Sequence, residues 1–425
     1  MSRVFDELQQ RGFLYQCTGE AELKTALQSG PVTFYVGFDP TADSLHVGSL
    51  IPILAMVHLQ RAGHRAIALT GGGTAMVGDP SGKTEMRQML TEERIRSNAV
   101  GISAQLARFL VLDGDKGLAL DNIAWLRDLR YIDFLRDIGR HFSVNRMLSA
   151  ESYKMRLETG LSFLEFNYML LQAYDFLVLL KDHGCTLQLG GQDQWGNIVA
   201  GIDLVRRETG RESHGLTFPL LTDASGNKLG KTVAGAVWLS SDRTSPFDFY
   251  QFWRNTDDRD VERFLKLFTF LPVDECGRLG KLAPPLLNRA KEILAFEITR
   301  IVHGDEAARQ TYLAIASQFG TADPEGKVAT TSAIAGLSAS AAEALPELVV
   351  PAADLAHGIM VAELLVRAGF CTSKGEARRM IRQGGTKLGE TAVTDETLKV
   401  SAMDLASSPI LKAGKKRMVR IVTGS

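Results

Sequence analysis

Along residues 1–232, short runs of β-branched and aromatic residues alternate with longer stretches whose apolar positions have a helical period. The run 31–38, PVTFYVGF, predicts a strand. Residues 46–64 predict a helix with Leu50, Leu54 and Val57 on one face and Gly63 as its stop. Two more apolar runs, RAIALT at 65–70 and GCTLQLGG at 184–191, lead into loop glycines. Strands that alternate with helices predict a parallel α/β sheet, with ligands at the carboxyl ends of its strands.

The pattern changes to helices from Ser245 onward. SPFDFYQFWRN begins with Ser as N-cap and Pro at the first helical position, and residues 288–304 form an amphipathic stretch that ends at Gly304. Residues 321–352 are rich in Ala, Ser and Thr and predict a linker. A compact unit of short helices, a Gly-Gly turn and strands follows at 353–425.

The 425-residue chain is 45% hydrophobic and carries a net charge of −1, which is typical of a globular protein and does not by itself indicate a nucleic-acid partner. The charge is unevenly distributed, however. From Met360 to Ser425 there are 12 Lys and Arg against 6 Asp and Glu, so this part carries +6 and the remainder −7. A basic module on an acidic body predicts a polyanionic partner bound at one end.

Four cysteines, at positions 17, 185, 276 and 371, are scattered singly, so the spacing indicates neither a zinc site nor a disulfide framework. The charged N-terminus MSRVFDELQQRG lacks the apolar core of a signal peptide, and no apolar run approaches the roughly 20 residues that span a bilayer. These features predict a reduced, cytoplasmic protein without a membrane partner.

Residues 46–49, HVGS, open the first predicted helix. Asp43 or Ser44 could cap this helix, whose free N-terminal amides attract phosphate. Gly48 would allow a base or ribose to approach the backbone, and His46 could donate to a phosphate oxygen. The alternative is an ordinary capping turn with a surface histidine, and four letters alone do not decide between the two.

Residues 78–84, GDPSGKT, come close to a phosphate-binding P-loop, but the glycine that this pattern needs at position 77 is Val77. We therefore reject the P-loop. Asp79 remains a candidate to hold an ammonium group at a strand end, and the alternative is a plain Asp-Pro turn.

Tyr168, Gln172 and Asp175 are spaced by four and three residues within an apolar helical stretch, so they share one face. An unpaired buried polar group costs about 1–3 kcal/mol, so either other side chains or a ligand must satisfy them. Farther along, LQLGGQDQWGN at 187–197 places Asp193 and Gln194 just after a strand. An acid there is suited to accept hydrogen bonds from ribose hydroxyls, and the alternative is a polar loop.

Basic residues gather at two places in the second half of the chain. In KLGKT at 228–232, two lysines flank a glycine turn and could clamp a polyphosphate, although exposed Lys-Gly loops are common. In the C-terminal unit, one helical face carries basic side chains with few acids beside them, which favours phosphate binding over a merely solvated face. These residues are Lys374, Arg378, Arg379 and Arg382.

Taken in order, YVGFDPTADSLHVGS, GGGTAMVGDPSGKT, YMLLQAYD, LQLGGQDQWGN and KLGKT resemble the bacterial tyrosyl-tRNA synthetases over nearly the whole chain. HVGS and KLGKT resemble the HIGH and KMSKS signatures of class I synthetases. The C-terminal unit resembles an RNA-binding domain shared with a small-subunit ribosomal protein. The resemblance implies a Rossmann-like catalytic domain at 1–232, an α-helical domain on the anticodon side at 233–320, the linker at 321–352 and an α+β RNA-binding domain at 353–425, in a homodimer.

The resemblance also implies a role for each matching position. For tyrosine, Tyr35 and Asp175 would bind the phenol, Gln194 would lie near the carboxylate, and the ammonium group would be held by Asp79, Tyr168 and Gln172. For ATP, the implied contacts are Gly37, Asp39, His46, Gly48, Ser49, Gly191, Asp193 and Lys231, with Gly191 and Asp193 at the ribose. The triphosphate in the transition state would be stabilised by Thr41, His46, Lys83, Arg87, Lys228 and Lys231.

The implied reaction has two steps. The carboxylate of L-tyrosine attacks the α-phosphate of ATP to give tyrosyl-adenylate and pyrophosphate, and a ribose hydroxyl at the 3′ end of tRNA(Tyr) then takes the tyrosyl group. Positioning and charge stabilisation suffice for this chemistry, with Mg²⁺ on the phosphates and no metal site built by the protein. Phenylalanine would leave Tyr35 and Asp175 unpaired, the logic of rejection for which tyrosyl-tRNA synthetases are the usual example.

Two positions depart from the family pattern. The last His of the usual signature is Ser49, which reaches less far than an imidazole, and the usual Cys is Val36, which cannot donate to ribose. We therefore expect weaker ATP binding than in relatives that carry both side chains.

Three other functions compete with this one. A tryptophanyl enzyme shares the architecture, but an Asp placed for a phenol argues against it. A small-molecule nucleotidyltransferase would not need the basic C-terminal unit. A non-catalytic RNA-binding protein would not need both phosphate signatures.

Overall fold

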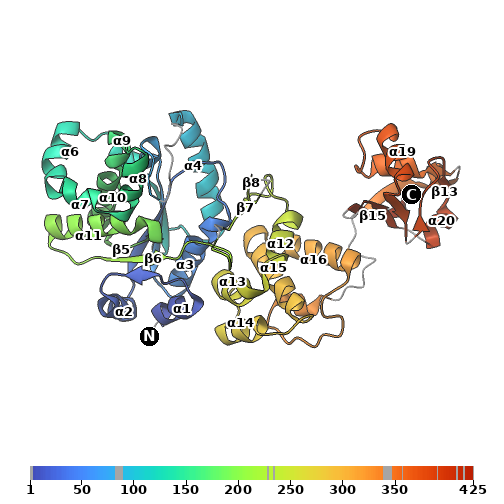
Figure 1. Cartoon of the computed structure of the whole chain (residues 1–425), viewed down its shortest axis with the longest axis horizontal. Coiled ribbons are helices and arrows are strands. Elements are labelled where there is room, and N and C mark those ends of the chain that lie inside the picture. The colour runs from blue at the N-terminus through green and yellow to red at the C-terminus, as the bar shows by residue number, and fades with distance from the viewer. Residues whose placement is uncertain are drawn as a thin grey trace. The chain divides into compact units, whose positions relative to one another are not determined.

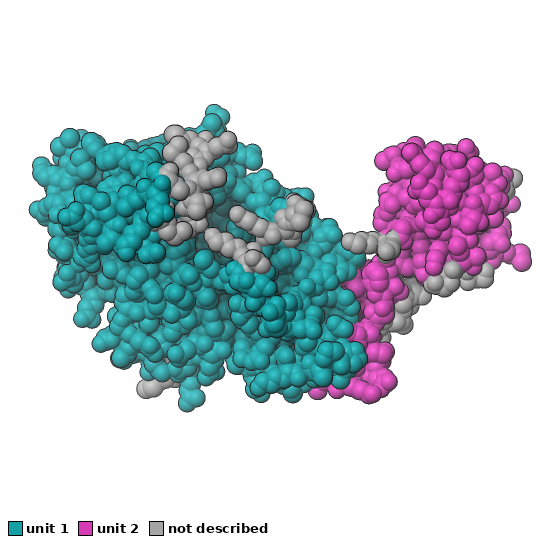
Figure 2. Space-filling model, in the orientation of Figure 1, with its two compact units in different colours: residues 1–305 teal, residues 306–425 magenta. Residues whose placement is uncertain are grey.

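The computed structural model describes residues 3–81, 90–226, 229–232, 235–337, 347–356, 358–389, 391–407, 410–414 and 417–424. The chain divides into two compact units, Met1–Asp305 and Glu306–Ser425 (Figure 2). The division falls at the start of a helix, α16, rather than at one of the boundaries predicted from sequence, and those boundaries stay predictions.

A six-stranded sheet of order β1-β6-β5-β2-β3-β4 forms the centre of the first unit. Its strands are β1 Gln16–Cys17, β2 Thr33–Phe38, β3 Arg65–Thr70, β4 Gly117–Asp121, β5 Cys185–Gly191 and β6 His214–Phe218. All neighbouring pairs from β4 to β6 are parallel, and β1 is an antiparallel edge strand. The predicted parallel α/β sheet is therefore confirmed. Because β2 lies between β3 and β5, the strand order reverses there, which is where such sheets bind ligands.

Helices cover both faces of this sheet (Figure 1). α3 Leu50–Arg61 and α4 Glu92–Leu106 pack on β3, whereas α10 Tyr168–His183 and α11 Trp195–Thr209 pack on β5. The other helices of this part are α1 Val4–Arg11, α2 Glu20–Ser29 and a series of short helices between β4 and α10: α5 Ile123–Leu126, α6 Tyr131–Asp137, α7 Val144–Leu148, α8 Glu151–Thr159 and α9 Phe163–Phe166. The helix predicted after HVGS is confirmed as α3, and Gly63 follows it with φ +95°.

Four helices follow the sheet within the first unit: α12 Pro246–Arg254, α13 Val261–Phe268, α14 Val273–Gly280 and α15 Leu287–His303. Ser245 caps α12 by accepting from the amide of Asp248, with Pro246 in the first turn, as predicted. The ring of Trp253 is fully buried among Phe249, Phe264 and Phe268 and packs α12 against α13. α16 Asp305–Phe319 continues the helical run.

The second unit contains a five-stranded sheet of order β12-β11-β14-β15-β9. Its strands are β9 Glu347–Pro351, β11 Thr386–Leu388, β12 Thr391–Ala392, β14 Ile410–Ala413 and β15 Arg417–Gly424. A smaller pair, β10 Ile359–Met360 and β13 Lys399–Val400, and the helices α17 Ala352–Ala356, α18 Val361–Arg367, α19 Lys374–Arg382 and α20 Ala402–Ser407 complete it. β9 lies within the segment predicted to be linker, where it pairs in parallel with β15.

One apolar stretch, Phe163–His183, has the length and composition of a membrane span. The prediction that no run approaches this length is therefore wrong for α9 and α10. The stretch is apolar because α10 packs between α11 and β5, and 56% of its most apolar window is buried inside the protein.

Candidate active site

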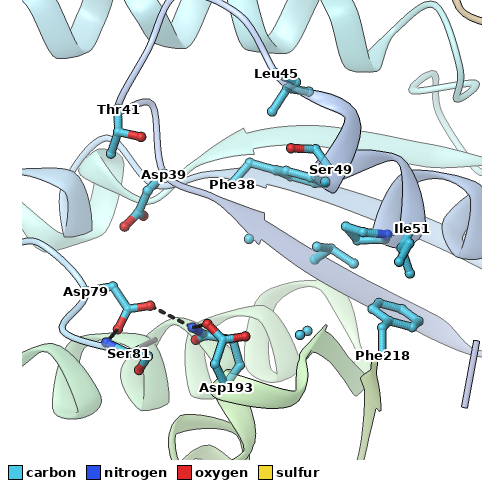
Figure 3. Close-up of a pocket in the computed structure, with 18 of the residues that line it drawn as sticks. Phe38, Asp39, Thr41, Leu45, Ser49, Ile51, Asp79, Ser81, Asp193 and Phe218 are labelled. Atoms are coloured by element: carbon cyan, nitrogen blue, oxygen red, sulfur yellow. Dashed lines mark hydrogen bonds between the residues drawn. The ribbon is translucent and has the colours of Figure 1, made fainter. Parts of the chain in front are cut away.

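A cavity of about 590 Å³ opens at the carboxyl ends of β2 and β5, where the strand order reverses (Figure 3). The loop after β2 carries Asp39 and Thr41 along one side of it, and Asp79 and Asp193 lie near each other on the opposite side. Ser49 and Ile51 line the side formed by α3. The polar motifs that are far apart in sequence therefore meet at the predicted edge of the sheet.

Three buried polar side chains form the deep end of this cavity: Tyr35, Asp175 and Gln188. Tyr35 and Gln188 are directly opposite one another on β2 and β5, so their side chains point to the same face of the sheet. The Tyr35 hydroxyl and the Gln188 amide oxygen have no hydrogen-bond partner among the described residues. Leaving such groups unpaired is costly, so this end of the cavity is built to receive a polar atom of a ligand.

Asp175 is held in place from two sides. Asn122 Nδ2 donates to its Oδ2 at 2.9 Å and Trp125 Nε1 donates to its Oδ1 at 2.8 Å. Burial raises the pKa of Asp175 to about 7, although both hydrogen bonds act to lower it. Burial also raises the pKa of Tyr35, and the charge of Asp175 adds to that rise.

A chain of hydrogen bonds continues from Asp175 toward the loop after β2. Asn122 Nδ2 also donates to Thr74 Oγ1 at 3.0 Å, and Thr74 Oγ1 donates to Asp39 Oδ1 at 2.8 Å. Tyr168 OH donates to Asp39 Oδ2 at 3.0 Å. The orientations of Asp175 and Asp39 are therefore linked through shared donors, and the polar face predicted on α10 is satisfied partly by other side chains.

Sequence reasoning missed Asn122, Trp125 and Thr74. Asn122 follows directly after β4, at the same edge of the sheet as the loops after β2 and β3, and its Oδ1 accepts from the amide of Gly73 at 2.7 Å. Its position after a parallel strand was the signal that could have identified it.

Asp79 also lines the cavity, where two hydrogen bonds hold its carboxylate. Its Oδ1 accepts from the amide of Ser81 at 2.9 Å, and its Oδ2 accepts from Gln194 Nε2 at 2.7 Å. Burial raises the pKa of Asp79 to about 6, and the charge of Asp39 contributes in the same direction. A buried carboxylate in this state favours a cationic ligand that would replace the lost solvation.

Gln194 and Gln172 are oriented by one further side chain. Asn197 Nδ2 donates to Gln194 Oε1 at 3.1 Å and to Gln172 Oε1 at 3.0 Å. Asn197 is buried on α11. It is the last residue of the motif LQLGGQDQWGN, but the sequence did not reveal its role. With Tyr168 and Asp79, these amides surround the middle of the cavity.

The start of α3 differs from the prediction in its cap. Neither Asp43 nor Ser44 caps it; His46 caps the short 3-10 turn Val47–Ser49 that leads into α3, because its Nδ1 accepts from the amide of Gly48 at 3.0 Å. Ser44 Oγ instead accepts from Gln105 Nε2 and from the amide of Ser240. Gly48 is required here, since a Cβ at this position would lie 2.7 Å from His46 Cε1.

The two signatures meet in space. Gly230 of KLGKT has φ +92°, and a Cβ on it would lie 2.5 Å from Val47 Cγ2 of HVGS. The amide of Val237 donates to the carbonyl of Gly230 at 3.0 Å, just beyond the short hairpin of β7 Lys231–Thr232 and β8 Gly235–Ala236. Of the predicted phosphate-binding residues, Lys83, Arg87 and Lys228 lie outside the described residues, as does the side chain of Lys231.

The remaining predicted nucleotide positions lie around the mouth of the cavity. Gly37 is exposed and a Cβ there would meet open space, and Thr41 and His46 are also exposed. A Cβ on Gly191 would lie 2.5 Å from Asp193 Oδ1. Val36 and Ser49, the two positions that depart from the family pattern, both line the cavity.

The basic side chains predicted for the second unit lie exposed on α19, but acids from other elements approach them. Lys374 Nζ lies 2.8 Å from Glu363 Oε2 of α18, and Arg382 Nε lies 3.3 Å from Glu396 Oε2. Arg378 and Arg379 have no ion-pair partner among the residues described. The cluster is therefore less basic than the helix alone suggested.

The described residues contain no group of three or more His, Cys, Asp and Glu side chains placed to hold a metal ion.

Comparison with known proteins defines the class of this fold and site. Residues 27–320 match the family model "tRNA synthetases class I (W and Y)", and residues 361–405 match the S4 domain. The chain therefore belongs to the class I tRNA synthetases.

Full-length relatives narrow the family. The tyrosine–tRNA ligase of Desulfosudis oleivorans is 55% identical over 99% of this chain and 98% of its own length. That of Syntrophus aciditrophicus is 51% identical over 99% of both chains. Within its class, the chain belongs to the tyrosine–tRNA ligase family.

A solved structure agrees with the assignment to this family. The crystal structure of a C-terminally truncated mitochondrial tyrosyl-tRNA synthetase from Aspergillus nidulans superposes with a TM-score of 0.67 at 30% identity, covering 75% of this chain and 95% of that one. The fold class predicted from the sequence is thereby confirmed.

Proposed function

We propose that this protein activates L-tyrosine with ATP and transfers the tyrosyl group to tRNA(Tyr). The observation that carries the choice of amino acid is the buried hydroxyl of Tyr35, which has no described partner and lies in the same cavity wall as Asp175. A phenol would accept from Tyr35 and donate to Asp175, whereas an indole could donate but not accept and a phenyl ring could do neither.

The rest of the amino acid fits the middle of the cavity. Its ammonium group would lie between Asp79, Tyr168 and Gln172, and its carboxylate near Gln194. Asp79 and Tyr168 are already oriented by hydrogen bonds within the protein, so binding would order few side chains.

ATP would occupy the side of the cavity next to the first signature. Gly37, Gly48 and Gly191 permit close approach of the nucleotide, and Asp39, Ser49 and Asp193 offer oxygens to ribose hydroxyls. Thr41, His46, Lys83, Arg87, Lys228 and Lys231 would surround the triphosphate. Since the described residues offer no dedicated metal site, Mg²⁺ would arrive with the nucleotide, where it would neutralise phosphate charge.

The activation step needs correct geometry more than acid–base chemistry. An oxygen of the tyrosine carboxylate attacks the α-phosphorus, the bond to the bridging oxygen breaks, and pyrophosphate leaves with the electron pair. The residues around the phosphates stabilise the charge that develops, and those around the tyrosine fix the attacking oxygen. In the second step a ribose hydroxyl of the tRNA attacks the tyrosyl carbonyl and AMP leaves.

The tRNA would be bound partly by the S4 domain. The exposed face of α19, with Arg378, Arg379, Lys374 and Arg382, is suited to phosphate contacts because its cations lie on one side. We infer a cytoplasmic location, because these substrates are those of protein synthesis.

A homodimer is favoured by an exposed apolar surface on the helices between β4 and α10. Large apolar side chains there are 42–70% exposed: Tyr131, Ile132, Val144, Leu157, Phe163 and Leu164. Surfaces of this kind mark protein interfaces. Ile132→Asp together with Phe163→Asp should convert a dimer into a monomer in analytical ultracentrifugation, and a monomeric unaltered protein would contradict the dimer.

The decisive test is ATP–pyrophosphate exchange with tyrosine, tryptophan and phenylalanine measured side by side, followed by charging of tRNA. We expect exchange that depends on tyrosine alone. Exchange with tryptophan instead, or none with tyrosine, would contradict the assignment.

The departures at Ser49 and Val36 predict a high KM for ATP. Restoring the family residues with Ser49→His and Val36→Cys should lower that KM without changing the KM for tyrosine. An unchanged KM for ATP in this double variant would show that neither position limits nucleotide binding.

A further inference from the structure

Residues 237–239, which follow the second signature KLGKT and the β7–β8 hairpin, are hydrogen-bonded to residues 45–47, at the start of the first signature HVGS. The amide of Val47 donates to the carbonyl of Val237 at 3.0 Å, and the amide of Leu239 donates to the carbonyl of Leu45 at 2.8 Å. Between these two bonds, His46 and Trp238 form an antiparallel bridge. Residues at such a pair lie directly opposite one another, so their side chains share one face.

Trp238 makes side-chain contacts on both sides of this bridge. Its ring meets the ring of His46 edge to face, with centroids 6.3 Å apart and planes at 68°. The guanidinium carbon of Arg243 lies 3.6 Å from the centroid of the Trp238 ring, a close cation–π contact. Trp238 also lines the cavity, beside His46 and Gly230.

Arg243 is in turn fixed by the turn before the first signature. Its Nη1 lies 2.6 Å from Asp43 Oδ1, and Arg94 of α4 approaches the other oxygen of Asp43 at 3.8 Å. The Asp43 backbone is itself held against α4, since a Cβ on Gly101 would lie 2.7 Å from the Asp43 carbonyl oxygen. Arg243 therefore joins Trp238 to a part of that turn whose backbone lies close against α4.

We propose that Trp238, held by Arg243 and Asp43, is a positioning residue that fixes His46 and the start of β7 relative to each other. His46 contacts Trp238 directly, and the carbonyl of Gly230, next to Lys231, is held by the amide of Val237, next to Trp238. Loss of this contact would let the two phosphate-binding signatures move apart while the tyrosine pocket stayed intact. The proposal rests on the proposed function for the role of His46.

Pyrophosphate exchange by full-length variants tests this inference. Trp238→Ala should lower kcat by about 10- to 100-fold, since small misplacements of reacting groups are costly, with the KM for tyrosine changed by less than about twofold. Trp238→Phe and Arg243→Lys keep a ring and a cation and should retain most of the activity. Arg61→Gln is the matched control. The guanidinium carbon of Arg61 lies 3.7 Å from the centroid of the Phe270 ring, a cation–π contact like that of Arg243, but Arg61 does not line the cavity.

A double-mutant cycle separates positioning from general stability. If Trp238 acts through His46, Trp238→Ala should cost much less in a His46→Asn background than in the unaltered protein. An equal loss in both backgrounds, or no loss from Trp238→Ala, would overturn the proposal. A parallel rise in the KM for tyrosine would do the same.

Amide hydrogen exchange gives a readout that does not depend on activity or on the alanine variant folding. Arg243→Gln removes a partly exposed cation, and it should speed exchange at Val47 and Leu239 while leaving α10 unchanged. Unchanged hydrogen exchange at both amides would contradict the proposal even if the protein lacked tyrosine-dependent ATP–pyrophosphate exchange activity. Absence of that activity in the unaltered protein would contradict the proposed function alone.

Discussion

Tyr35 and Tyr153 are two buried tyrosines whose hydroxyl groups have different surroundings. Tyr153 OH donates to the carbonyl of Phe166 at 2.8 Å and accepts from the amide of Met169 at 3.3 Å, so it serves the fold. Tyr35 OH has no partner among the described residues, although it is equally inaccessible. A buried donor without a structural partner indicates a group kept for a ligand.

Tyr35→Phe should therefore weaken selection of tyrosine over phenylalanine without harming the fold. The lost hydrogen bond to the substrate phenol is worth about 0.5–1.5 kcal/mol, so we expect kcat/KM for tyrosine to fall up to about tenfold. The kcat/KM for phenylalanine should not fall, because phenylalanine has no hydroxyl group that could bond to Tyr35. The measurement is pyrophosphate exchange with both amino acids.

Tyr153→Phe is the matched control. It should cost about 1 kcal/mol of unfolding free energy, because it breaks hydrogen bonds of the fold, and leave the selectivity unchanged. A Tyr35→Phe variant with unchanged selectivity would show that this hydroxyl does not contact the substrate.

The buried carboxyl groups predict how substrate binding depends on pH. With pKa values of about 7 for Asp175 and about 6 for Asp79, both are ionised above pH 7 and take up protons as the pH falls. Protonated Asp79 cannot neutralise an ammonium group, and protonated Asp175 is a poorer acceptor for the phenol. We therefore expect kcat/KM for tyrosine, which reports the free enzyme, to fall as the pH drops from 8 through 7 and 6.

A pH profile of pyrophosphate exchange from 5 to 8.5 checks this expectation. The KM for ATP should change much less over the same range, because neither carboxyl group is proposed to touch the nucleotide. A flat profile of kcat/KM for tyrosine would contradict the assignment of both groups to tyrosine binding.

At the scale of elements, two arginines from the sheet-containing part of the first unit cap helices that follow it. Arg11 is 5% exposed and donates to the carbonyls of Lys266, Thr269 and Leu271, at the end of α13. The exposed Arg108 donates to the carbonyl of Val302, near the end of α15, at 2.7 Å. Cations stabilise the C-terminal ends of helices, where carbonyl groups lack partners within the helix.

Arg11→Met should destabilise the first unit by about 2–5 kcal/mol, since two buried carbonyls and one partly buried carbonyl lose a charged donor at once. Urea denaturation followed by circular dichroism measures the loss. Arg108→Met removes an exposed donor to a single carbonyl and should cost only about 1 kcal/mol. Equal losses from both variants would mean that burial does not determine the strength of these caps.

Sequence periodicity predicted the main elements well but not these caps. The strands β2, β3 and β5 and the helices α3, α10, α12 and α15 lie where the sequence predicted them, because burial of apolar side chains imposes a pattern on such segments, whereas β1, β4 and β6 were not predicted. Arg11 and its acceptors are separated by more than 250 residues, and no local pattern reports such a contact.

At the scale of the whole molecule, the second unit adds a basic surface to a chain whose first unit carries the cavity. Among the cations of α19, Lys374 and Arg382 are paired with acids, whereas Arg378 and Arg379 are exposed without an ion-pair partner among the described residues. The unpaired cations should therefore contribute most to phosphate binding, because they give up no existing partner.

Arg378→Gln with Arg379→Gln should raise the KM for tRNA by about tenfold and make charging less sensitive to salt, since fewer counterions are released. Lys374→Gln is the paired comparison and should have a smaller effect. Pyrophosphate exchange, which needs no tRNA, should be unchanged in both variants. Equal effects of the two changes on the KM for tRNA would contradict a special role for the unpaired arginines.

A shortened chain ending at Leu337 tests the division of labour between the units. It should retain pyrophosphate exchange within about twofold, because the cavity lies wholly in the first unit, and charge tRNA poorly. The C-terminally truncated relative from Aspergillus nidulans, whose structure resembles this chain, makes such a form feasible. Loss of pyrophosphate exchange in the shortened protein would show that the second unit supports the catalytic site.

The sequence by itself determined the kind of sheet and the order of the motifs, because each lies within a local pattern of strand, loop or helix. The side chains proposed to contact tyrosine, Tyr35, Asp79 and Asp175 among them, were predicted from the resemblance of those motifs to a known family. Only the tertiary structure identified Asn122, Trp125 and Asn197 as the donors that orient those side chains. It also showed that His46 caps its own turn and lies against Trp238, almost 200 residues later in the chain. The reason is physical: a hydrogen bond or a ring contact depends on distance in space, and neighbours brought together by a parallel sheet leave no periodicity in the sequence.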